Sequence, residues 1–200
     1  MSYNPNIHHR QSIRLKGYDY SQAGLYYVTL CVYNRVCMFG RIENGEMILN
    51  DSGRIAQQCW LEIPRHYPNV VLHEYVIMPN HVHGIVQIGD AMDGCDDWDC
   101  RGECKGEKFF APTIAPTVGP TYAPTDEQMV IRGTSRTIGS MLRGFKIGVT
   151  KWMRQNTNVQ NVWQRNYYEH IIRNEQSYQN IAEYIVGNPA KWKDDKFYVM

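Results

Sequence analysis

The chain has 200 residues, 43% of them hydrophobic, which is enough to bury one core and predicts a single domain over residues 1–200. No apolar run approaches the roughly 18 residues of a membrane span and no charged-then-apolar leader is present, so the sequence predicts neither a membrane protein nor a secreted one and favours the cytoplasm. The net charge of +1 is unevenly distributed along the chain. Residues 90–108 hold seven acidic and three basic side chains, which leaves a net charge of +5 for the rest of the chain. This positive charge permits a polyanionic partner.

The first half of the chain predicts a strand, a helix and then two more strands. These elements are expected at residues 25–36, 51–65, 70–78 and 81–88. Asp51 or Ser52 can cap the helix. Its apolar stripe would be formed by Ile55, Cys59 and Ile63. The turn residues Pro79 and Asn80 separate the last two strands, and residues 47–49 are too short to classify.

Residues 90–131 break the periodic pattern. The acidic stretch is followed by three Ala-Pro-Thr repeats, and proline at this density excludes both a helix and a central strand. We therefore predict a flexible acidic and proline-rich insertion within the domain. Three of its residues are cysteines, Cys95, Cys100 and Cys104, and free thiols fit them better than a zinc site because no fourth ligand stands nearby. The six cysteines of the chain form no regular disulfide framework, which fits a reducing compartment.

The second half predicts a helix, a short extended segment and a final helix. They are expected at residues 134–154, 162–172 and 177–186. Thr134 or Ser135 can cap the first helix, and Ser177 can cap the last. The order strand, helix, strand, strand, helix, short strand, helix suits an α+β fold in which an antiparallel sheet carries helices on one face.

The helix at 134–154 is the best candidate for a binding surface. Its apolar residues cluster on one side, and five cations gather on the other side and its flank. These are Arg136, Arg143, Lys146, Lys151 and Arg154. An ordinary amphipathic helix would explain the cations equally well, but no carboxylate occurs between residues 136 and 154, whereas solvated faces usually mix both signs. The pattern therefore favours binding of phosphates.

Two pairs of residues suggest a metal-dependent reaction. His81 and His83 lie two apart in a strand, so both imidazoles face one side, as a divalent metal needs. Tyr184 and Asn188 lie four apart on the last helix and share a face. A phenol is a weak nucleophile, but a metal that polarises a phosphodiester makes its attack plausible. The amide oxygen of Asn188 suits Mg²⁺ or Mn²⁺ as a third ligand, although the flanking glycine and proline predict a frayed helix end there.

These residues match a known family. His81-Val82-His83 resembles the HUH motif, and Tyr184 with Asn188 resembles the tyrosine helix of the single-tyrosine HUH transposases. The match extends to residues 19–24 (DYSQAG), 78–84 (MPNHVHG), 143–146 (RGFK) and 162–170 (VWQRNYYEH). The ordered set resembles the REP-associated tyrosine transposases and covers most of the chain outside residues 90–131.

The resemblance implies a ferredoxin-like fold, shared with RNA-recognition domains, with the metal site on the central sheet. It implies that Tyr184 attacks single-stranded DNA and forms a 5′-phosphotyrosine, with Mg²⁺ or Mn²⁺ held by His81, His83 and Asn188. Because the link conserves bond energy, rejoining needs no ATP. The substrate would be a hairpin with a short unpaired guide sequence, bound by a monomer or a homodimer. The expected DNA contacts are Arg136, Arg143, Lys146, Lys151, Arg154, Trp163, Arg165 and His170.

Three functions of different classes stay open at this level. The first is the DNA strand-transferring enzyme, with Tyr184 as nucleophile and Tyr168, which precedes Glu169-His170, as the second choice. The second is a hairpin-binding module without chemistry, which the same basic helix would serve. The third is a metal-dependent phosphodiesterase in which water replaces the tyrosine as nucleophile.

Overall fold

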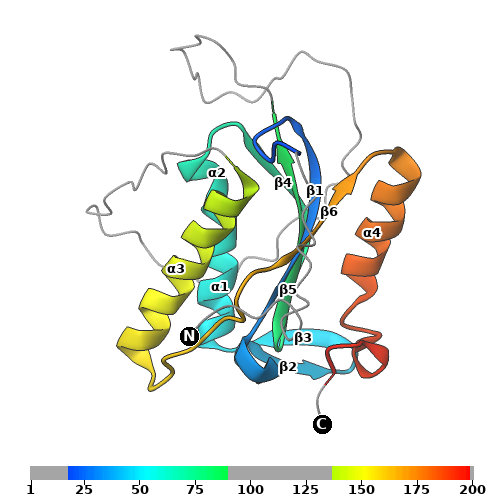
Figure 1. Cartoon of the computed structure of the whole chain (residues 1–200). Helices are drawn as coiled ribbons and strands as arrows, with labels where there is room; N and C mark the ends of the chain where they lie inside the picture. The colour runs from blue at the N-terminus through cyan, green and yellow to red at the C-terminus, as the bar shows by residue number, and fades with distance from the viewer. Residues whose placement is uncertain (1–17, 90–136, 199–200) are drawn as a thin grey trace, which may run out of the picture. The chain divides into compact units, whose positions relative to one another are not determined.

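In the computed structural model, which describes residues 18–89 and 137–198, four strands form one antiparallel sheet (Figure 1). They are β1 (Gly24–Cys31), β4 (Val70–Met78), β5 (His81–Ile88) and β6 (Tyr168–Ile172). The helices are α1 (Asp51–Leu61), α2 (Ile63–His66), α3 (Ile138–Asn156) and α4 (Glu175–Gly187). The insertion expected at residues 90–131 lies outside the described residues, so its flexible character stays a prediction.

The sheet has the strand order β4-β5-β1-β6, with β1 and β5 in the centre. Two of its connections are the crossovers through α1 and α3, and the third is the two-residue turn at Pro79 and Asn80. A strand–helix–strand–strand–helix–strand chain in this order is the ferredoxin-like arrangement. The predicted α+β class and antiparallel sheet are therefore confirmed.

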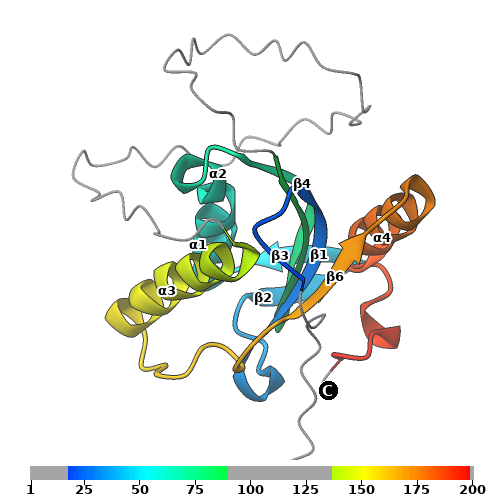
Figure 2. The same ribbon diagram turned by 45° about the horizontal axis from the view of Figure 1, so that its top comes forward.

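One face of the sheet packs against α1 and α3 and holds the main core. Alternate side chains of β1, those of Tyr26, Val28 and Leu30, point to this face and are fully buried. The helix α3 contributes a buried apolar stripe that runs from Ile138 to Met153. Figures 1 and 2 show α1 and α3 side by side on this face.

The opposite face carries α4, which lies on the side away from α1 and α3 (Figure 2) and contacts β4 and part of β5. Ile185 of α4 is fully buried there together with Ile85 and Ile172. The expectation of helices on one face holds for α1, α2 and α3 but not for α4. The reason is that β5 is apolar on both sides, with Val82 and Val86 facing the main core and Ile85 facing α4.

The helix caps lie near the residues expected from the sequence but not at them. They are Asn50, Thr137 and Asn174, whose side-chain oxygens accept hydrogen bonds from backbone N–H groups at 2.9, 3.3 and 2.8 Å. The expected caps Asp51, Ser52 and Ser177 lie instead within the first turns, and Thr134 and Ser135 lie outside the described residues. Several polar residues precede each helix, and spacing alone does not choose among them.

Two further elements refine the expected order. A two-stranded hairpin of β2 (Gly40–Glu43) and β3 (Glu46–Leu49) follows β1 and includes the unclassified residues 47–49. Within the extended segment at 162–172, only β6 joins the sheet, and Trp163 adds an isolated bridge to Val32. Among the helices in the described ranges, none has the length and hydropathy needed to cross a membrane.

The buried residues of α1 differ in part from the expected stripe, of which Ile63, at the start of α2, is buried in the main core. Ala56 and Trp60 are fully buried, whereas the expected Ile55 and Cys59 are only half-buried. The Trp60 ring occupies the space above Gly84 of β5, where an added Cβ would lie 2.3 Å from Trp60 Cζ2. The main core therefore requires glycine immediately after the histidine pair.

Gly84→Ala is expected to destabilise the protein by about 1–3 kcal/mol, since the new methyl group overlaps a buried indole in a closely packed core. Urea unfolding monitored by circular dichroism measures this change. The matched control is Gly144→Ala on α3, where an added Cβ meets nothing within 4 Å and a gain of about 0.5–1 kcal/mol is expected. Equal stability of the two variants would refute the close contact.

Candidate active site

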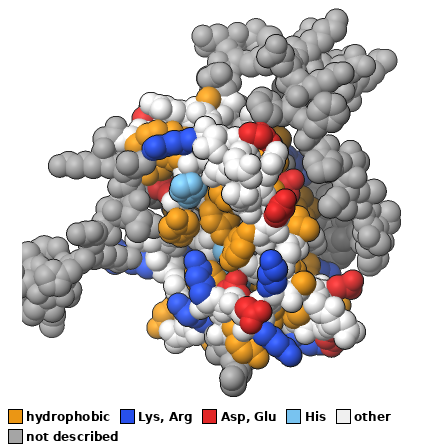
Figure 3. Space-filling model, turned by 90° about the vertical axis from the view of Figure 1, so that its right-hand side faces the viewer, with side chains coloured by type: hydrophobic (Ala, Val, Ile, Leu, Met, Phe, Trp, Pro, Cys, Tyr) orange, Lys and Arg blue, Asp and Glu red, His pale blue; other side chains and the backbone are white. Residues whose placement is uncertain are grey.

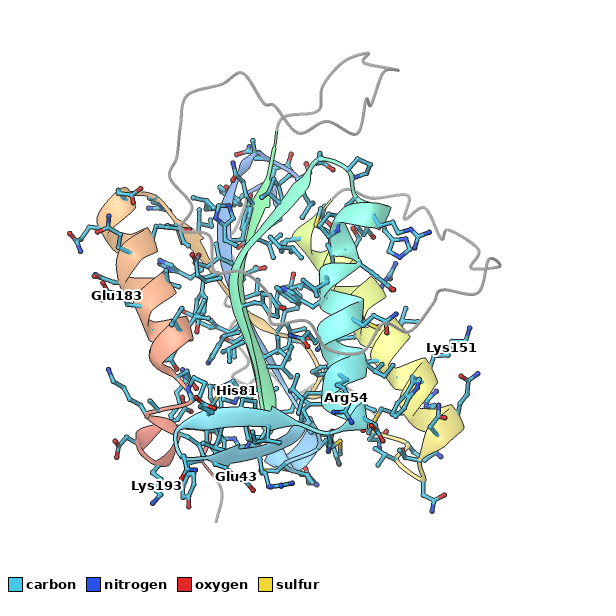
Figure 4. All side chains as sticks on the ribbon, turned by 180° about the vertical axis from the view of Figure 1, so that it is seen from behind. Glu43, Arg54, His81, Lys151, Glu183 and Lys193 are labelled. Carbon is cyan, nitrogen blue, oxygen red and sulfur yellow. The ribbon has the colours of Figure 1, made fainter. Side chains whose placement is uncertain are left out.

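The register of β5 brings the two histidines to the α4 face of the sheet. His81 lies opposite Cys31 of β1, and His83 lies opposite Thr29. Both imidazoles are fully buried, and their ring centroids are 4.4 Å apart. Figure 4 shows His81 between the sheet and the end of α4. The expected side-by-side pair is therefore present, at the start of the central strand β5.

Asn80 of the turn before β5 determines the tautomer of His81. The amide nitrogen of Asn80 donates to the carbonyls of Arg35 at 3.0 Å and Phe197 at 2.8 Å. Its amide oxygen is then the acceptor that faces His81 Nδ1, 2.9 Å away. A proton on Nδ1 leaves the lone pair of Nε2 free to bind a metal.

His83 is oriented in the same way by hydroxyl groups of β1. Its Nδ1 lies 2.8 Å from Tyr27 Oη and 2.9 Å from Thr29 Oγ1. Because the Thr29 hydroxyl donates to Tyr27 Oη at 3.3 Å, the Thr29 oxygen can accept the Nδ1 proton. The Nε2 atom faces the other way and lies 3.4 Å from Tyr184 Oη. With the proton on Nδ1, each histidine directs its Nε2 away from its supporting side chains, and for His81 the Asn80 amide oxygen favours that tautomer.

The helix α4 brings Tyr184 and Asn188 to these histidines. The ring centroids of Tyr184 and His83 are 5.3 Å apart, and 41% of Tyr184 is exposed, so a large substrate can reach the phenol. Asn188 is only 2% exposed and keeps helical angles, with φ −60° and ψ −43°. The expected frayed end is therefore wrong, because the Asn188 side chain is held in place from outside the helix.

Asp195 is the residue that holds the Asn188 side chain in place. Its Oδ2 accepts hydrogen bonds from Asn188 Nδ2 and from Tyr184 Oη, both at 3.1 Å. Its Oδ1 accepts the backbone N–H of Phe197 at 2.6 Å. One carboxylate thus fixes the phenol and the amide at the same time.

The sequence did not reveal Asp195 as a site residue. It follows α4 and a short 3-10 helix (Trp192–Asp194), so no helical or strand period relates it to Tyr184. Its ligand oxygen and the ring nitrogens of His81 and His83 nevertheless lie within 4.8 Å of one another. The only signal was the acidic pair Asp194-Asp195 close behind the tyrosine helix.

The electrostatic surroundings keep both histidines neutral. Burial lowers the pKa of His81 to about 4; the positive charges of Lys196 and Arg35 lower it too, whereas Asp195 raises it. Burial also lowers the pKa of His83 well below 6.5, and His81 and Lys196 act in the same direction. At neutral pH both side chains are neutral imidazoles, which is the form that binds metal ions.

The phenol of Tyr184 is protonated under the same conditions. Burial, followed by the charge and the hydrogen bond of Asp195, raises the pKa of Tyr184 to about 12. The hydroxyl is therefore a donor to the carboxylate at neutral pH, and any reaction at Oη must remove its proton.

The donor atoms of this cluster fit a divalent cation. Among the described residues, His81 Nε2 and Asn188 Oδ1 are buried polar atoms without a hydrogen-bond partner. Such atoms are unfavourable in a folded protein, and a bound cation is one kind of partner that would satisfy them. Imidazole nitrogens, an amide oxygen and a carboxylate together suit Mg²⁺ or Mn²⁺. The possible ligand atoms of His81, His83 and Asp195 cluster together, and Asn188 is hydrogen-bonded to Asp195, so these four residues form a candidate metal centre.

The cations predicted on α3 do not join this cluster. Arg143, Lys151 and Arg154 are exposed on α3, which packs on the other face of the sheet. Figure 4 shows Lys151 on the outer side of α3, away from His81. Their contact with DNA stays a prediction, and Arg136 lies outside the described residues.

Lys146 and Trp163 connect α3 to the segment before β6. Lys146 Nζ donates to the carbonyls of Gln164 at 3.0 Å and Asn166 at 2.6 Å, and burial lowers the pKa of Lys146 to about 8. The half-buried indole of Trp163 donates to the Lys146 carbonyl at 3.2 Å and packs on Phe145. These contacts account for both residues by packing, and a DNA contact for either stays a prediction.

The other predicted contacts are open to solvent. Arg165, Tyr168 and His170 are exposed, and Tyr168 and His170 lie on β6 facing the same side as the histidine pair. Two cations that the sequence did not single out, Arg35 and Lys196, lie nearer the pair. They lie 5.4 and 4.8 Å from the centroid of the Phe197 ring, which packs on His81.

Comparison with known proteins places the chain in a family. No family model matches it. The chain is 46% identical over 197 residues to a protein of Haemophilus influenzae described as an uncharacterized protein, and the match covers 98% of this chain and 97% of that one. The chain therefore belongs to the family of this Haemophilus protein.

A solved structure gives the class of fold. It is the structure of a REP-associated tyrosine transposase bound to a REP hairpin, and it matches with a TM-score of 0.53 and 18% identity over 92% of this chain and 76% of that one. The chain thus has the fold of a REP-associated tyrosine transposase, as its motifs indicated.

The stability of the metal-free protein is expected to depend on pH through His81. The pKa of His81 is about 4 in the folded protein and 6.5 in its ordinary state, so the unfolded chain binds the proton more readily between these values. The contribution of His81 to stability should therefore be fully present above pH 6.5 and be lost as the pH falls to 4, by an amount on the order of 3 kcal/mol, and His83, whose pKa is also lowered by burial, should act in the same direction. Urea unfolding with a chelator present measures this slope. The slope should become less steep in His81→Asn, where only the contribution of His83 remains, and an equally steep slope in that variant would contradict the assignment.

Proposed function

We propose that this protein is a metal-dependent DNA strand-transferring enzyme of the tyrosine transposase type, which cleaves and rejoins single-stranded hairpin DNA through Tyr184. One observation carries the proposal: Tyr184 Oη lies 3.4 Å from His83 Nε2 and 3.1 Å from Asp195 Oδ2, at the edge of a group of possible metal-ligand atoms. A nucleophile, a proton acceptor and a cation site then meet at one point on the surface. The fold shared with a REP-associated tyrosine transposase supports the same class.

The cation would be held by His81 Nε2, His83 Nε2 and Asn188 Oδ1, with Asp195 adjoining them. A bound Mg²⁺ or Mn²⁺ supplies Lewis acidity, which draws charge from a phosphodiester oxygen and makes phosphorus more electrophilic. Asp195 accepts from Asn188 Nδ2 at 3.1 Å and so turns the amide oxygen away from itself. This explains why Asn188 Oδ1 is buried without a protein partner.

In the proposed reaction, Tyr184 Oη attacks phosphorus. The Oη–P bond forms as the P–O3′ bond breaks, which leaves a 5′-phosphotyrosine and a free 3′ hydroxyl once the leaving oxygen takes up a proton. Asp195 Oδ2, which already accepts the phenol hydrogen bond, is placed to take the proton from Oη. Because one phosphodiester is exchanged for another, attack by a 3′ hydroxyl on the phosphotyrosine rejoins DNA without ATP.

The proposed substrate is hairpin DNA with an unpaired flank. The similar solved structure contains a REP hairpin, and the cations Arg35 and Lys196 beside the histidines could neutralise phosphates next to the scissile bond. The exposed edge of Tyr184 suits a single strand, which can bend to present one phosphate.

Tyr184→Phe is expected to abolish a covalent protein–DNA adduct, because the variant lacks the attacking oxygen. The assay incubates the protein with Mn²⁺ and a labelled pool of DNA hairpins that carry randomised single-stranded flanks, and separates denaturant-resistant adducts by gel electrophoresis. The matched control, Tyr168→Phe, should keep the adduct, and His81→Ala should lose it. An adduct that persists in Tyr184→Phe would overturn the nucleophile.

Two other outcomes of this assay distinguish the remaining classes. Cleavage by the wild-type protein without any adduct would indicate attack by water. Binding of the pool with neither cleavage nor adduct would indicate a hairpin-binding module without chemistry.

Asp195→Asn is expected to weaken Mn²⁺ binding by roughly 10–100-fold, since the variant removes the negative charge that lies beside the ligands and fixes Asn188. Isothermal titration calorimetry of the metal alone measures the affinity. The matched control is Asp194→Asn, a neighbouring exposed carboxylate, which should bind Mn²⁺ as the wild-type protein does. Wild-type affinity in Asp195→Asn would exclude its part in the metal centre.

A further inference from the structure

The helix α4, which carries Tyr184, is held to the sheet by a small apolar contact. Within α4, whose residues are all described, Ile185 alone is buried, whereas α3 buries six residues. Ile185 packs with Ile85 and Ile172 of the sheet, with half-buried apolar side chains around them, and its neighbour Val186 is 59% exposed. Figure 3, seen from the side of α4, shows hydrophobic side chains among polar ones at the surface. The position of α4 therefore depends on more than apolar burial.

A β-bulge in β4 provides the additional contacts. The register of β4 against β5 shifts between Leu72 and Tyr75, so that His73 and Glu74 both lie opposite Ile85. In a regular strand, two consecutive side chains point to opposite faces, and only one of them could reach α4. The bulge turns both side chains toward this helix.

The two residues of the bulge bind one hydroxyl group in the first turn of α4, that of Tyr178. Its Oη donates to Glu74 Oε2 at 2.8 Å, and His73 Nδ1 lies 3.1 Å from the same oxygen. His73 Nε2 lies 2.9 Å from Gln87 Oε1 on β5. Burial, followed by the hydrogen bond and the charge of Glu74, raises the pKa of Tyr178, so the hydroxyl keeps its proton at neutral pH. These four half-buried residues are called here the Tyr178 clamp.

The Tyr178 clamp and the candidate active site lie at opposite ends of the same helix face. Tyr178, Ile185 and Asn188 are seven and then three residues apart, which places them on one side of α4. From Tyr178 to Asn188 the helix axis advances about 15 Å. The clamp fixes the first end of this face, and the hydrogen bond from Asn188 to Asp195 fixes the last. Two such points determine the tilt and rotation of a helix, and with them the place of Tyr184.

We propose that Tyr178 is a positioning residue for the reaction: the Tyr178 clamp sets the tilt of α4 and thereby keeps the Tyr184 hydroxyl beside His83 Nε2. The proposal rests on the proposed function, in which Tyr184 is the nucleophile. Since 41% of Tyr184 is exposed, its own ring packing does little to hold the hydroxyl 3.4 Å from His83 Nε2. A misplacement of about 1 Å in a reacting group can lower a rate by about 100-fold. Tyr178 acts through the helix and not by contact with the reacting atoms.

Tyr178→Phe tests the proposal, because it removes the clamped hydroxyl and keeps the ring that packs on the sheet. In the adduct assay with Mn²⁺ and the hairpin pool, we expect the rate at saturating DNA to fall by roughly 10- to 100-fold. The affinity for the same hairpins, measured with a chelator present, should stay unchanged. Loss of the fold would lower both quantities, whereas a displaced nucleophile lowers the rate alone.

A second readout needs no catalysis. In protein with isotope-labelled tyrosine and histidine rings, a nuclear Overhauser effect should connect Tyr184 and His83, whose ring centroids are 5.3 Å apart. Its absence in Tyr184→Phe assigns the signal. Tyr178→Phe should weaken this effect. The effect between His81 and His83, whose ring centroids are 4.4 Å apart on the sheet itself, should persist as an internal control.

The matched control is Tyr75→Phe, which removes another half-buried hydroxyl from β4. The Tyr75 hydroxyl accepts from Gln57 Nε2 at 3.2 Å on the face of α1, so this variant should keep the wild-type rate and ring contact. Glu74→Gln keeps an acceptor for Tyr178 and should retain the rate, whereas Glu74→Ala should resemble Tyr178→Phe. The double variant Tyr178→Phe/Glu74→Ala should lose no more than either single variant, because both remove the same contact.

The outcomes separate this proposal from the proposed function. An unchanged rate and an unchanged contact between Tyr184 and His83 in Tyr178→Phe would overturn the positioning role, as would a rate and a hairpin affinity that fall in parallel. A wild-type protein that forms no adduct would contradict the proposed function instead. The NMR comparison would then still decide whether the Tyr178 clamp sets the place of Tyr184.

Discussion

The register of β5 against its two neighbours is the constraint on which the candidate site depends. Side chains alternate along a strand, so the same strand sends Val82 and Val86 into the main core and His81 and His83 to the α4 face. A slip of one residue would bury both imidazoles among α1 and α3 and expose the valines. The contact of Gly84 with Trp60 and the two-residue turn before His81 exclude such a slip, because each fits one register only.

Much of the fold followed from periodicity. Runs rich in β-branched residues identified β1, β4 and β5, and the apolar stripe identified α3, since these patterns report burial directly. The sequence did not predict that α4 lies on the face opposite to the other helices. An apolar stripe shows that a helix packs on something but not on which side, and that choice was made by Ile85, which makes β5 apolar on the second face as well.

The candidate site, like the fold, could be predicted from the sequence only in part. His81 with His83 and Tyr184 with Asn188 were recognisable because both pairs have the spacing of a regular element. Asp195 has no such spacing; it reaches the site only because the chain turns back after α4 and brings its carboxylate within 3.1 Å of Tyr184 and Asn188. For the α3 cations the uniform charge is evident in the sequence, whereas the sheet that separates them from the histidines is not.

Asn80 is the residue whose role extends furthest. Asn80 is buried in the β4–β5 turn. Its side-chain amide donates hydrogen bonds to the carbonyls of Arg35 and Phe197, and its amide oxygen faces His81 Nδ1. Three segments far apart in sequence are therefore locked together before any ion arrives, and the ligand geometry is preorganised. Little reorganisation remains for metal binding. The free energy of cation binding can therefore appear almost entirely as affinity. By linkage, the bound cation also raises the resistance of the whole domain to unfolding.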